Sequence, residues 1–155
     1  MDHLYSPRKL VASVRRLVQA HDRYTSVKRY YFGDDLLFMR EAHLISVVGS
    51  LSSPTMSEIS KALGVTPGAV SQLANRMEEK GYICRTVGTE DKRQSHVHLT
   101  ERGERFYQQH QAYDQKKLQE LSAALECYSP QDLDRYIEIQ NIISQLLEET
   151  PDGDR

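Results

Sequence analysis

The spacing of apolar residues in the first part of the chain predicts helices. Apolar or aromatic side chains recur every three or four residues over 7–31, with arginines off that stripe, and again over 36–51. This is the period of an amphipathic helix that buries one face. Ser6 can cap the first helix, and Pro7 suits its first turn. Two successive helices are therefore expected.

Residues 56–81 predict two more helices joined by a tight turn. Ser57 can cap the first, which ends at Gly64, and Thr66 can cap the second, with Pro67 at its first position. Gly64 stands where the turn requires a left-handed backbone. The side chains that would face each other or the core are apolar: Ile59, Leu63, Val65, Val70 and Leu73. This is the arrangement of a helix-turn-helix.

From residue 82 the apolar period changes to two. Residues 82–87 and 95–99 read as strands, and the loop 88–94 joins them into a β-hairpin. Thr100 can then cap a long helix over about 101–126. A last helix runs from Ser129 and Pro130 to about residue 147. The expected fold is mainly α with a small β-hairpin wing, a winged helix-turn-helix with long flanking helices.

The second helix of the helix-turn-helix has a small and polar outer side. Its candidates for contact with base edges are Thr66, Pro67, Gly68, Ser71, Gln72 and Asn75. Asn and Gln can bind adenine through two hydrogen bonds. An ordinary solvated helix face usually carries more Glu and Lys, whereas charges here begin only at Arg76. The pattern favours a helix that reads double-stranded DNA.

The loop of the hairpin places charged residues at the tip of the wing. Arg93 there would enter the minor groove, where the negative potential is strongest, and Lys92 would contact phosphates. Asp91 needs a cationic partner in such a place, and Arg76 is the natural one. We expect this pair to fix the angle between the wing and the helix.

The motif Asp91-x-Arg93, followed after five residues by Leu99-Thr100 and then Gly103, resembles that of the MarR family of winged-helix transcription regulators, and so does the stretch 63–83. The resemblance implies a homodimer in which segments 4–18 and 128–147 of two protomers interleave. It also implies a repressor of a pseudo-palindromic operator whose DNA affinity responds to an effector.

The resemblance divides one continuous domain into functional regions. Residues 1–35 and 101–150 would form the helical dimerisation region, residues 36–100 the DNA-binding region, and residues 151–155 a tail. The charge distribution agrees, because residues 106–155 carry ten Asp and Glu but only four Lys and Arg, although the net charge of the 155-residue chain is only −2. The acidic end would lie away from DNA.

Other function classes have less support. The chain has no nucleophile–base spacing, Gly-rich phosphate loop or HExxH motif, so we expect no enzyme and no required cofactor. It also has no apolar run of membrane-spanning length and no signal peptide, which favours a cytoplasmic protein without a membrane partner. The alternative from another class is a winged-helix protein-interaction module that does not bind DNA.

Three histidines lie on or beside the apolar stripes of different helices: His21, His43 and His110. With Asp114, one turn after His110, they could supply three nitrogens and one oxygen to a tetrahedral Zn²⁺. Zinc-sensing members of the family use histidines at the places of His43 and His110, so a zinc-responsive regulator of the same fold is an alternative. The other interpretation is structural histidines, or a pocket for an organic effector near Tyr24, Tyr31 and Tyr113.

Overall fold

The computed structural model describes residues 6–32, 36–87 and 95–148. The chain divides into two compact units, Met1–Tyr113 and Asp114–Arg155. In chain order the elements are α1 (Pro7–Thr25), β1 (Arg29–Tyr30), β2 (Leu36–Leu37), α2 (Met39–Leu51), α3 (Met56–Leu63), α4 (Pro67–Glu79), β3 (Ile83–Val87), β4 (Ser95–Leu99), α5 (Glu101–Ala124) and α6 (Pro130–Glu148). β1 pairs with β2 and β3 with β4, both antiparallel. The expected mainly α fold with a hairpin wing is confirmed.

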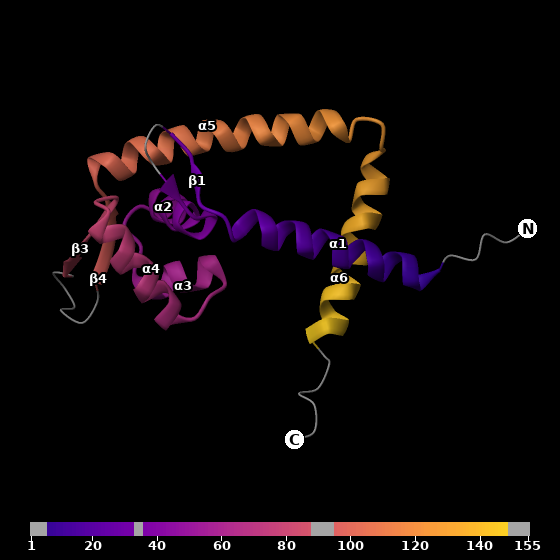
Figure 1. Cartoon of the computed structure of the whole chain (residues 1–155), viewed down its shortest axis with the longest axis horizontal. Helices are drawn as coiled ribbons and strands as arrows, with labels where there is room; N and C mark the ends of the chain where they lie inside the picture. Colours follow the sequence, from indigo (N-terminus) through magenta and orange to yellow (C-terminus); the bar gives the residue numbers. More distant parts are fainter. Residues whose placement is uncertain (1–5, 33–35, 88–94, 149–155) are drawn as a thin grey trace, which may run out of the picture. The chain divides into compact units, whose positions relative to one another are not determined.

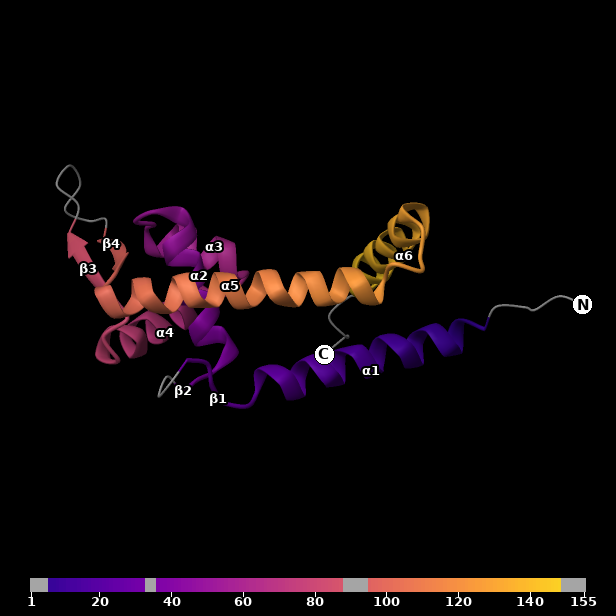
Figure 2. The same cartoon turned by 90° about the horizontal axis from the view of Figure 1, so that it is seen from above.

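The core of the first unit lies where α2, α3 and α4 meet the β3–β4 hairpin and the start of α5. Figures 1 and 2 show these elements gathered at one end of α5. The largest fully buried side chains come from all of them and include Leu44, Ile59, Met77, Tyr82, Ile83, Val97 and Phe106. Burial of one such side chain contributes about 1.5–3 kcal/mol. The helix-turn-helix is thus held by its own core.

The first helix ends earlier than the sequence pattern predicted. α1 stops at Thr25, where the hydroxyl of Thr25 donates to the Asp22 carbonyl at 3.2 Å. The expected helical residues near 31 instead include strand β1, in which Tyr30 pairs with Leu36. Aromatic side chains fit a pleated strand well, and the ring of Tyr31 packs on Phe106 at 5.6 Å. The prediction of a helix to residue 31 was therefore wrong.

The second helix begins later than predicted, at Met39 rather than 36. Leu36 and Leu37 form β2, and Leu37 is buried in the core. The backbone N–H of Phe38 donates to the Glu41 carboxylate at 2.9 Å, which satisfies a donor that the helix start would leave unpaired. The pairing of β1 with β2 and the hydrogen bond from Phe38 to Glu41 together set the first residue of α2.

The remaining elements match the sequence prediction closely, apart from one cap. Thr55, not Ser57, caps α3: its hydroxyl accepts from the Glu58 N–H at 3.3 Å, and its own N–H donates to the Glu58 carboxylate at 2.8 Å. This reciprocal pair is a capping box. In the second unit, Ser129 and Asp132 form the same motif at the start of α6.

α6 has no buried residue among those whose side chains are described. Its exposed large apolar side chains are Tyr136, Ile137, Ile139, Ile142 and Leu146. In the described part of the chain, no helix is both long and apolar enough to cross a membrane.

Candidate nucleic-acid interface

The turn between α3 and α4 has the conformation that the sequence predicted. Gly64 has φ +63°, and among the described residues nothing lies within 4 Å of the place where its Cβ would be, so the backbone conformation is what requires glycine. Thr66 Oγ1 accepts from the Ala69 N–H at 3.4 Å and caps α4. Ser60 Oγ donates to the Val65 carbonyl at 2.6 Å. Two hydroxyls therefore fix how α4 leaves the turn.

α4 has one buried and one exposed side. The buried side consists of Val70, Leu73, Ala74 and Met77. All six candidates for DNA contact are exposed: Thr66, Pro67, Gly68, Ser71, Gln72 and Asn75. We call these six residues the recognition face. Its side chains are uncharged and mostly small, so DNA bases can approach them closely.

Gly68 is the residue of the recognition face that the fold explains least. Its backbone is helical, and in the part of the chain that the structure describes a Cβ at this position would meet nothing within 4 Å. Alanine is a better helix former than glycine by up to about 1 kcal/mol. Neither internal packing nor backbone conformation calls for glycine here. The missing side chain leaves room for the backbone of α4 to approach a partner closely.

The β3–β4 hairpin follows α4 as a wing, with Ile83 opposite Leu99 and Val87 opposite Ser95. Its connecting loop, 88–94, lies outside the described residues. The roles of Lys92 and Arg93 and the pair between Asp91 and Arg76 therefore stay predictions. Arg76 itself is exposed on α4.

Arg85 of β3 joins the wing to α4 and was not singled out by the sequence pattern. Its Nη2 donates to Asn75 Oδ1 at 2.6 Å, and its Nε lies 3.6 Å from Glu78 Oε2. Asn75 and Glu78 are one turn apart, so the guanidinium spans a turn of the recognition helix. Strand alternation alone shows which face Arg85 occupies but not which helix it reaches.

The C-terminal end of α4 is anchored on two sides. Lys80 Nζ lies 3.0 and 2.9 Å from the two carboxylate oxygens of Glu41, whose side chain is buried at the start of α2. Arg102 donates to the Lys80 carbonyl at 2.9 Å, and Thr100 donates to the Gly81 carbonyl at 2.6 Å. Removing one partner of a buried ion pair leaves an uncompensated charge. The orientation of α4 is thus tied to both α2 and α5.

The two wing histidines, His96 and His98, hold the turn that precedes α3. His98 lies between two hydroxyls, with Nδ1 2.8 Å from Ser53 Oγ and Nε2 2.7 Å from Thr86 Oγ1. His96 Nδ1 lies 2.9 Å from the Ser53 carbonyl. Ser53 and its neighbour Ser52 both have positive φ, a conformation that non-glycine residues rarely adopt. The wing therefore supports a strained turn at the start of the helix-turn-helix.

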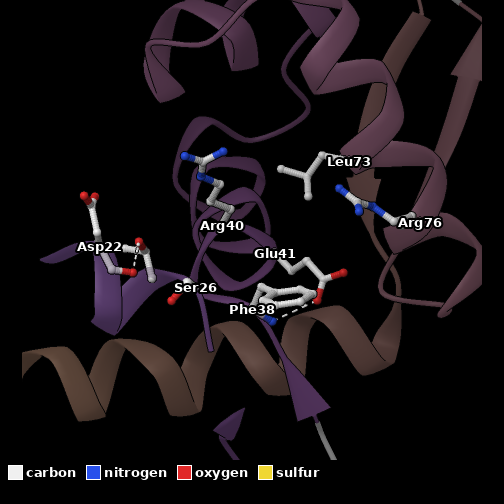
Figure 3. A pocket seen from close by; sticks show the side chains of 8 residues that line it. Asp22, Ser26, Phe38, Arg40, Glu41, Leu73 and Arg76 are labelled. Carbon is white, nitrogen blue, oxygen red and sulfur yellow. Dashed lines mark hydrogen bonds between the residues drawn. The ribbon is translucent and has the colours of Figure 1, made fainter. Parts of the chain in front are cut away.

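A crevice lies between the end of α1, the start of α2 and α4. One part, of about 430 Å³, is lined by Asp22, Thr25, Ser26, Phe38, Arg40, Glu41, Leu73 and Arg76. An adjoining part, of about 240 Å³, shares several of these residues and adds His21 and His43. Figure 3 shows Arg40, Leu73 and Arg76 along one side and Phe38 with Glu41 along the other. Its size is in the range of small-molecule sites.

The histidine candidates are not brought together. His21 and His43 are exposed and line the same part of the crevice. His110 is instead buried, with its ring 5.6 Å from the rings of both Phe106 and Tyr31. Asp114 is exposed on α5. Within residues 6–32, 36–87 and 95–148, no group of three or more His, Cys, Asp or Glu could hold a metal ion.

Tyr31, which packs beside His110, is partly buried. Burial raises the pKa of the Tyr31 hydroxyl above its ordinary value of 10.0, with a smaller contribution from Tyr24. The Tyr31 hydroxyl lies 3.6 Å from Met39 Sδ. Tyr31 therefore stays neutral near pH 7, and the ring cluster around His110 is part of the packed interior.

Comparison with known proteins gives a consistent result. The model of the MarR family matches residues 35–94, which span β2, the helix-turn-helix and most of the wing. HTH-type transcriptional regulator YhjH of Bacillus subtilis is 21% identical over 141 residues, which are 83% of this chain and 81% of YhjH.

Solved structures resemble the chain over nearly its whole length. FabT of Streptococcus pneumoniae, in complex with DNA, is 26% identical with a TM-score of 0.65, over 93% of this chain and 96% of FabT. ZitR of Lactococcus lactis, a zinc-responsive MarR family member, is 16% identical with a TM-score of 0.69, over 89% of this chain and 99% of ZitR, and shows a shared fold. In its helix-turn-helix, exposed recognition face and wing, the chain is thus similar to the MarR family of transcriptional regulators, most directly over residues 35–94.

Proposed function

We propose that this protein is a homodimeric repressor that binds a pseudo-palindromic double-stranded DNA operator in the cytoplasm and responds to a small organic effector. The observation that carries the proposal is the recognition face, which is uncharged and exposed, while Val70, Leu73, Ala74 and Met77 on the opposite side of α4 are buried. FabT, whose solved structure contains DNA, supports the same use of this fold. The wing residues Lys92 and Arg93 would add phosphate and minor-groove contacts.

The exposed apolar side chains of the flanking helices support a homodimer. Val11, Leu17 and Val18 of α1 are more than half exposed, and α1 has no buried residue. α6 exposes a similar set, as described above. Exposed apolar surface on this scale is typical of protein–protein interfaces. In a two-fold dimer the two recognition helices would read half-sites about 34 Å apart, one turn of DNA.

The crevice beside α4 supports the effector part of the proposal. Phe38 and Leu73 offer apolar surface, while Arg40 and Arg76 offer cationic hydrogen-bond donors. A ligand bound there touches Leu73 and Arg76 of the recognition helix directly. It can therefore favour one orientation of α4 over another, which is the physical requirement for coupling between ligand and DNA binding.

Binding to randomised DNA tests the proposal. Duplexes selected by the protein should share a pseudo-palindromic sequence, and their affinity should fall steeply as salt is raised, because phosphate contacts release counterions. A protein-interaction module of the same fold would select no sequence. For the effector, small organic acids that raise the melting temperature of the protein should weaken operator binding, and Arg40→Ala should reduce both effects.

A further inference from the structure

The amide of Asn75 is oriented by a charged neighbour. Nη2 of Arg85, in β3, lies 2.6 Å from Oδ1 of Asn75, in α4. Arg85 is itself held in place, because its side chain is only 28% exposed and its Nε lies 3.6 Å from Glu78 Oε2. A donor fixed in this way offers Asn75 one charge-assisted hydrogen bond in one direction.

The chemistry of the two groups settles which end of the amide faces Arg85. A guanidinium group has five N–H donors and no acceptor. The atom of Asn75 opposite Arg85 must therefore be the carbonyl oxygen, and not the NH₂ group. The oxygen is drawn toward the wing, and the NH₂ group is left as the outward part of an exposed side chain.

We propose that Arg85 is a specificity-determining positioning residue, which turns Asn75 into a hydrogen-bond donor toward the major groove. The proposal rests on the DNA-binding function proposed above. A bidentate contact with adenine needs both ends of the amide, because adenine presents one acceptor and one donor. A donor alone suits an edge that presents only acceptors: N7 and O6 of guanine, or O4 of thymine. Asn75 therefore favours guanine or thymine over adenine, where it could reach only N7, and Gln72 is the amide left for a bidentate contact with adenine.

The test compares base preferences and not affinities alone. Operators are selected from a randomised duplex library with the wild type, and the affinity for each base is then measured at every half-site position. Asn75→Ala identifies the position that Asn75 reads, as the one where preference is lost. We expect guanine or thymine there in the wild type, and at least a tenfold loss of that preference in Arg85→Met.

Two further variants separate positioning from general effects. Arg85→Lys keeps a donor near Asn75 Oδ1, so we expect it to restore part of the preference. Arg105→Met removes a guanidinium from α5, where it pairs with Glu101, and should leave every base preference unchanged. A purely structural role of Arg85 would lower the affinity for all sequences equally.

Several results would overturn the inference. One is that the wild type prefers adenine at the position that Asn75 reads. Another is that no position loses its preference in Asn75→Ala, and a third is that the preference at the position that Asn75 reads is unchanged in Arg85→Met. In each case the wild type still selects a sequence, so the proposed function survives. If the wild type selects no sequence at all, the proposed function fails first, and the inference fails with it.

Discussion

α4 and α6 are both helices with apolar stripes, but only α4 covers its stripe within one chain. α4 buries Val70, Leu73, Ala74 and Met77, whereas α6 leaves large apolar side chains such as Tyr136, Ile137, Ile139, Ile142 and Leu146 43–62% exposed. Burial of one isoleucine contributes about 2 kcal/mol. The helix-turn-helix is therefore complete in a single chain, while the apolar side chains of α6 are available to the partner chain of the proposed dimer.

The difference extends to what each helix shows to solvent. The exposed side of α4 is small and polar, which suits a partner with hydrogen-bonding edges. The exposed residues of α6 include a set of large apolar side chains, which suits a second apolar surface. The two surfaces proposed to bind DNA and a second copy of the chain thus differ in chemistry, and changes in each should have separable effects.

The largest effect is expected from charges on α6. Ile139→Glu combined with Ile142→Glu should convert the dimer to a monomer, because carboxylates cannot be buried in an apolar interface without cost. Operator affinity should fall by about 100-fold or more, since linked half-sites gain that much from joint binding. Sedimentation velocity and gel shifts measure the two quantities. Glu138→Gln, on the same helix, is the control, and a double variant that stays dimeric would remove α6 from the interface.

A smaller effect, on the first unit itself, is expected from Gly103→Ala. A Cβ at Gly103 would lie 2.0 Å from the Tyr82 carbonyl oxygen, a backbone atom that cannot turn aside. We expect the free energy of unfolding to fall by about 3 kcal/mol, at the upper end for overpacking. Urea denaturation measures it. An unchanged midpoint would show that α5 does not pack here as described.

The wing is expected to contribute next. Arg93→Ala should lose about 1–3 kcal/mol of specific binding, while Lys92→Ala should weaken all sequences alike and reduce the salt slope by about one unit. Both can be measured by titration at several salt concentrations. If Arg93→Ala binds the operator as well as the wild type, the wing does not read the groove.

The predicted pair between Asp91 and Arg76 is tested by a double-mutant cycle on operator affinity. The two changes should show a coupling free energy of at least a few tenths of a kcal/mol.

Gly68→Ala separates folding from binding most cleanly. The added methyl group meets no atom of the described residues within 4 Å, so the free energy of unfolding should stay equal or rise by up to about 1 kcal/mol. Operator affinity should fall about tenfold, the range of one disturbed base contact. Circular dichroism melts and gel shifts on the same sample give both numbers. Unchanged affinity would place Gly68 outside the DNA contact.

The smallest effect concerns the caps of α3 and α6. The backbone N–H and hydroxyl of Thr55 donate to Glu58 and hold the pKa of that carboxyl below its ordinary value of 4.5. Its folded pKa is therefore lower than its unfolded pKa, so its stabilisation is present above pH 4.5 and is lost as pH falls through the folded value. Glu58→Gln should melt slightly below the wild type at pH 7, and the difference should vanish in acid. Asp132→Asn tests the matching cap of α6. A difference in melting temperature that persists in acid would show that the ionised carboxylate is not the source of the stabilisation.

The sequence predicted the parts of the fold that depend on local chemistry. Gly64 and Thr66 define the turn before α4 by backbone conformation and capping, and both can be recognised from a few neighbouring residues. The buried and exposed sides of α4 follow from helical period alone. The turn and the two sides of α4 could therefore be predicted without knowing which elements pack against them.

The parts that failed depend on partners far away in the chain. Tyr31 fits the stripe of a long helix, but the helix ends at Thr25, and the ring of Tyr31 packs on Phe106 from the segment that follows β1. Helical period shows which face of its helix His21 or His110 occupies. It does not show whether residues of different helices meet, so the sequence could not test their expected convergence. The contact of Arg85 with Asn75 is equally invisible, because strand alternation says nothing about the helix opposite.

The stoichiometry of the complex with a selected operator tests both interfaces together. Sedimentation equilibrium of the protein with a duplex that carries two half-sites about one helical turn apart should show two chains per duplex. A duplex with one half-site should bind far more weakly. One chain per duplex with unchanged affinity, or equal binding to any sequence, would contradict a dimer that reads DNA through two α4 helices.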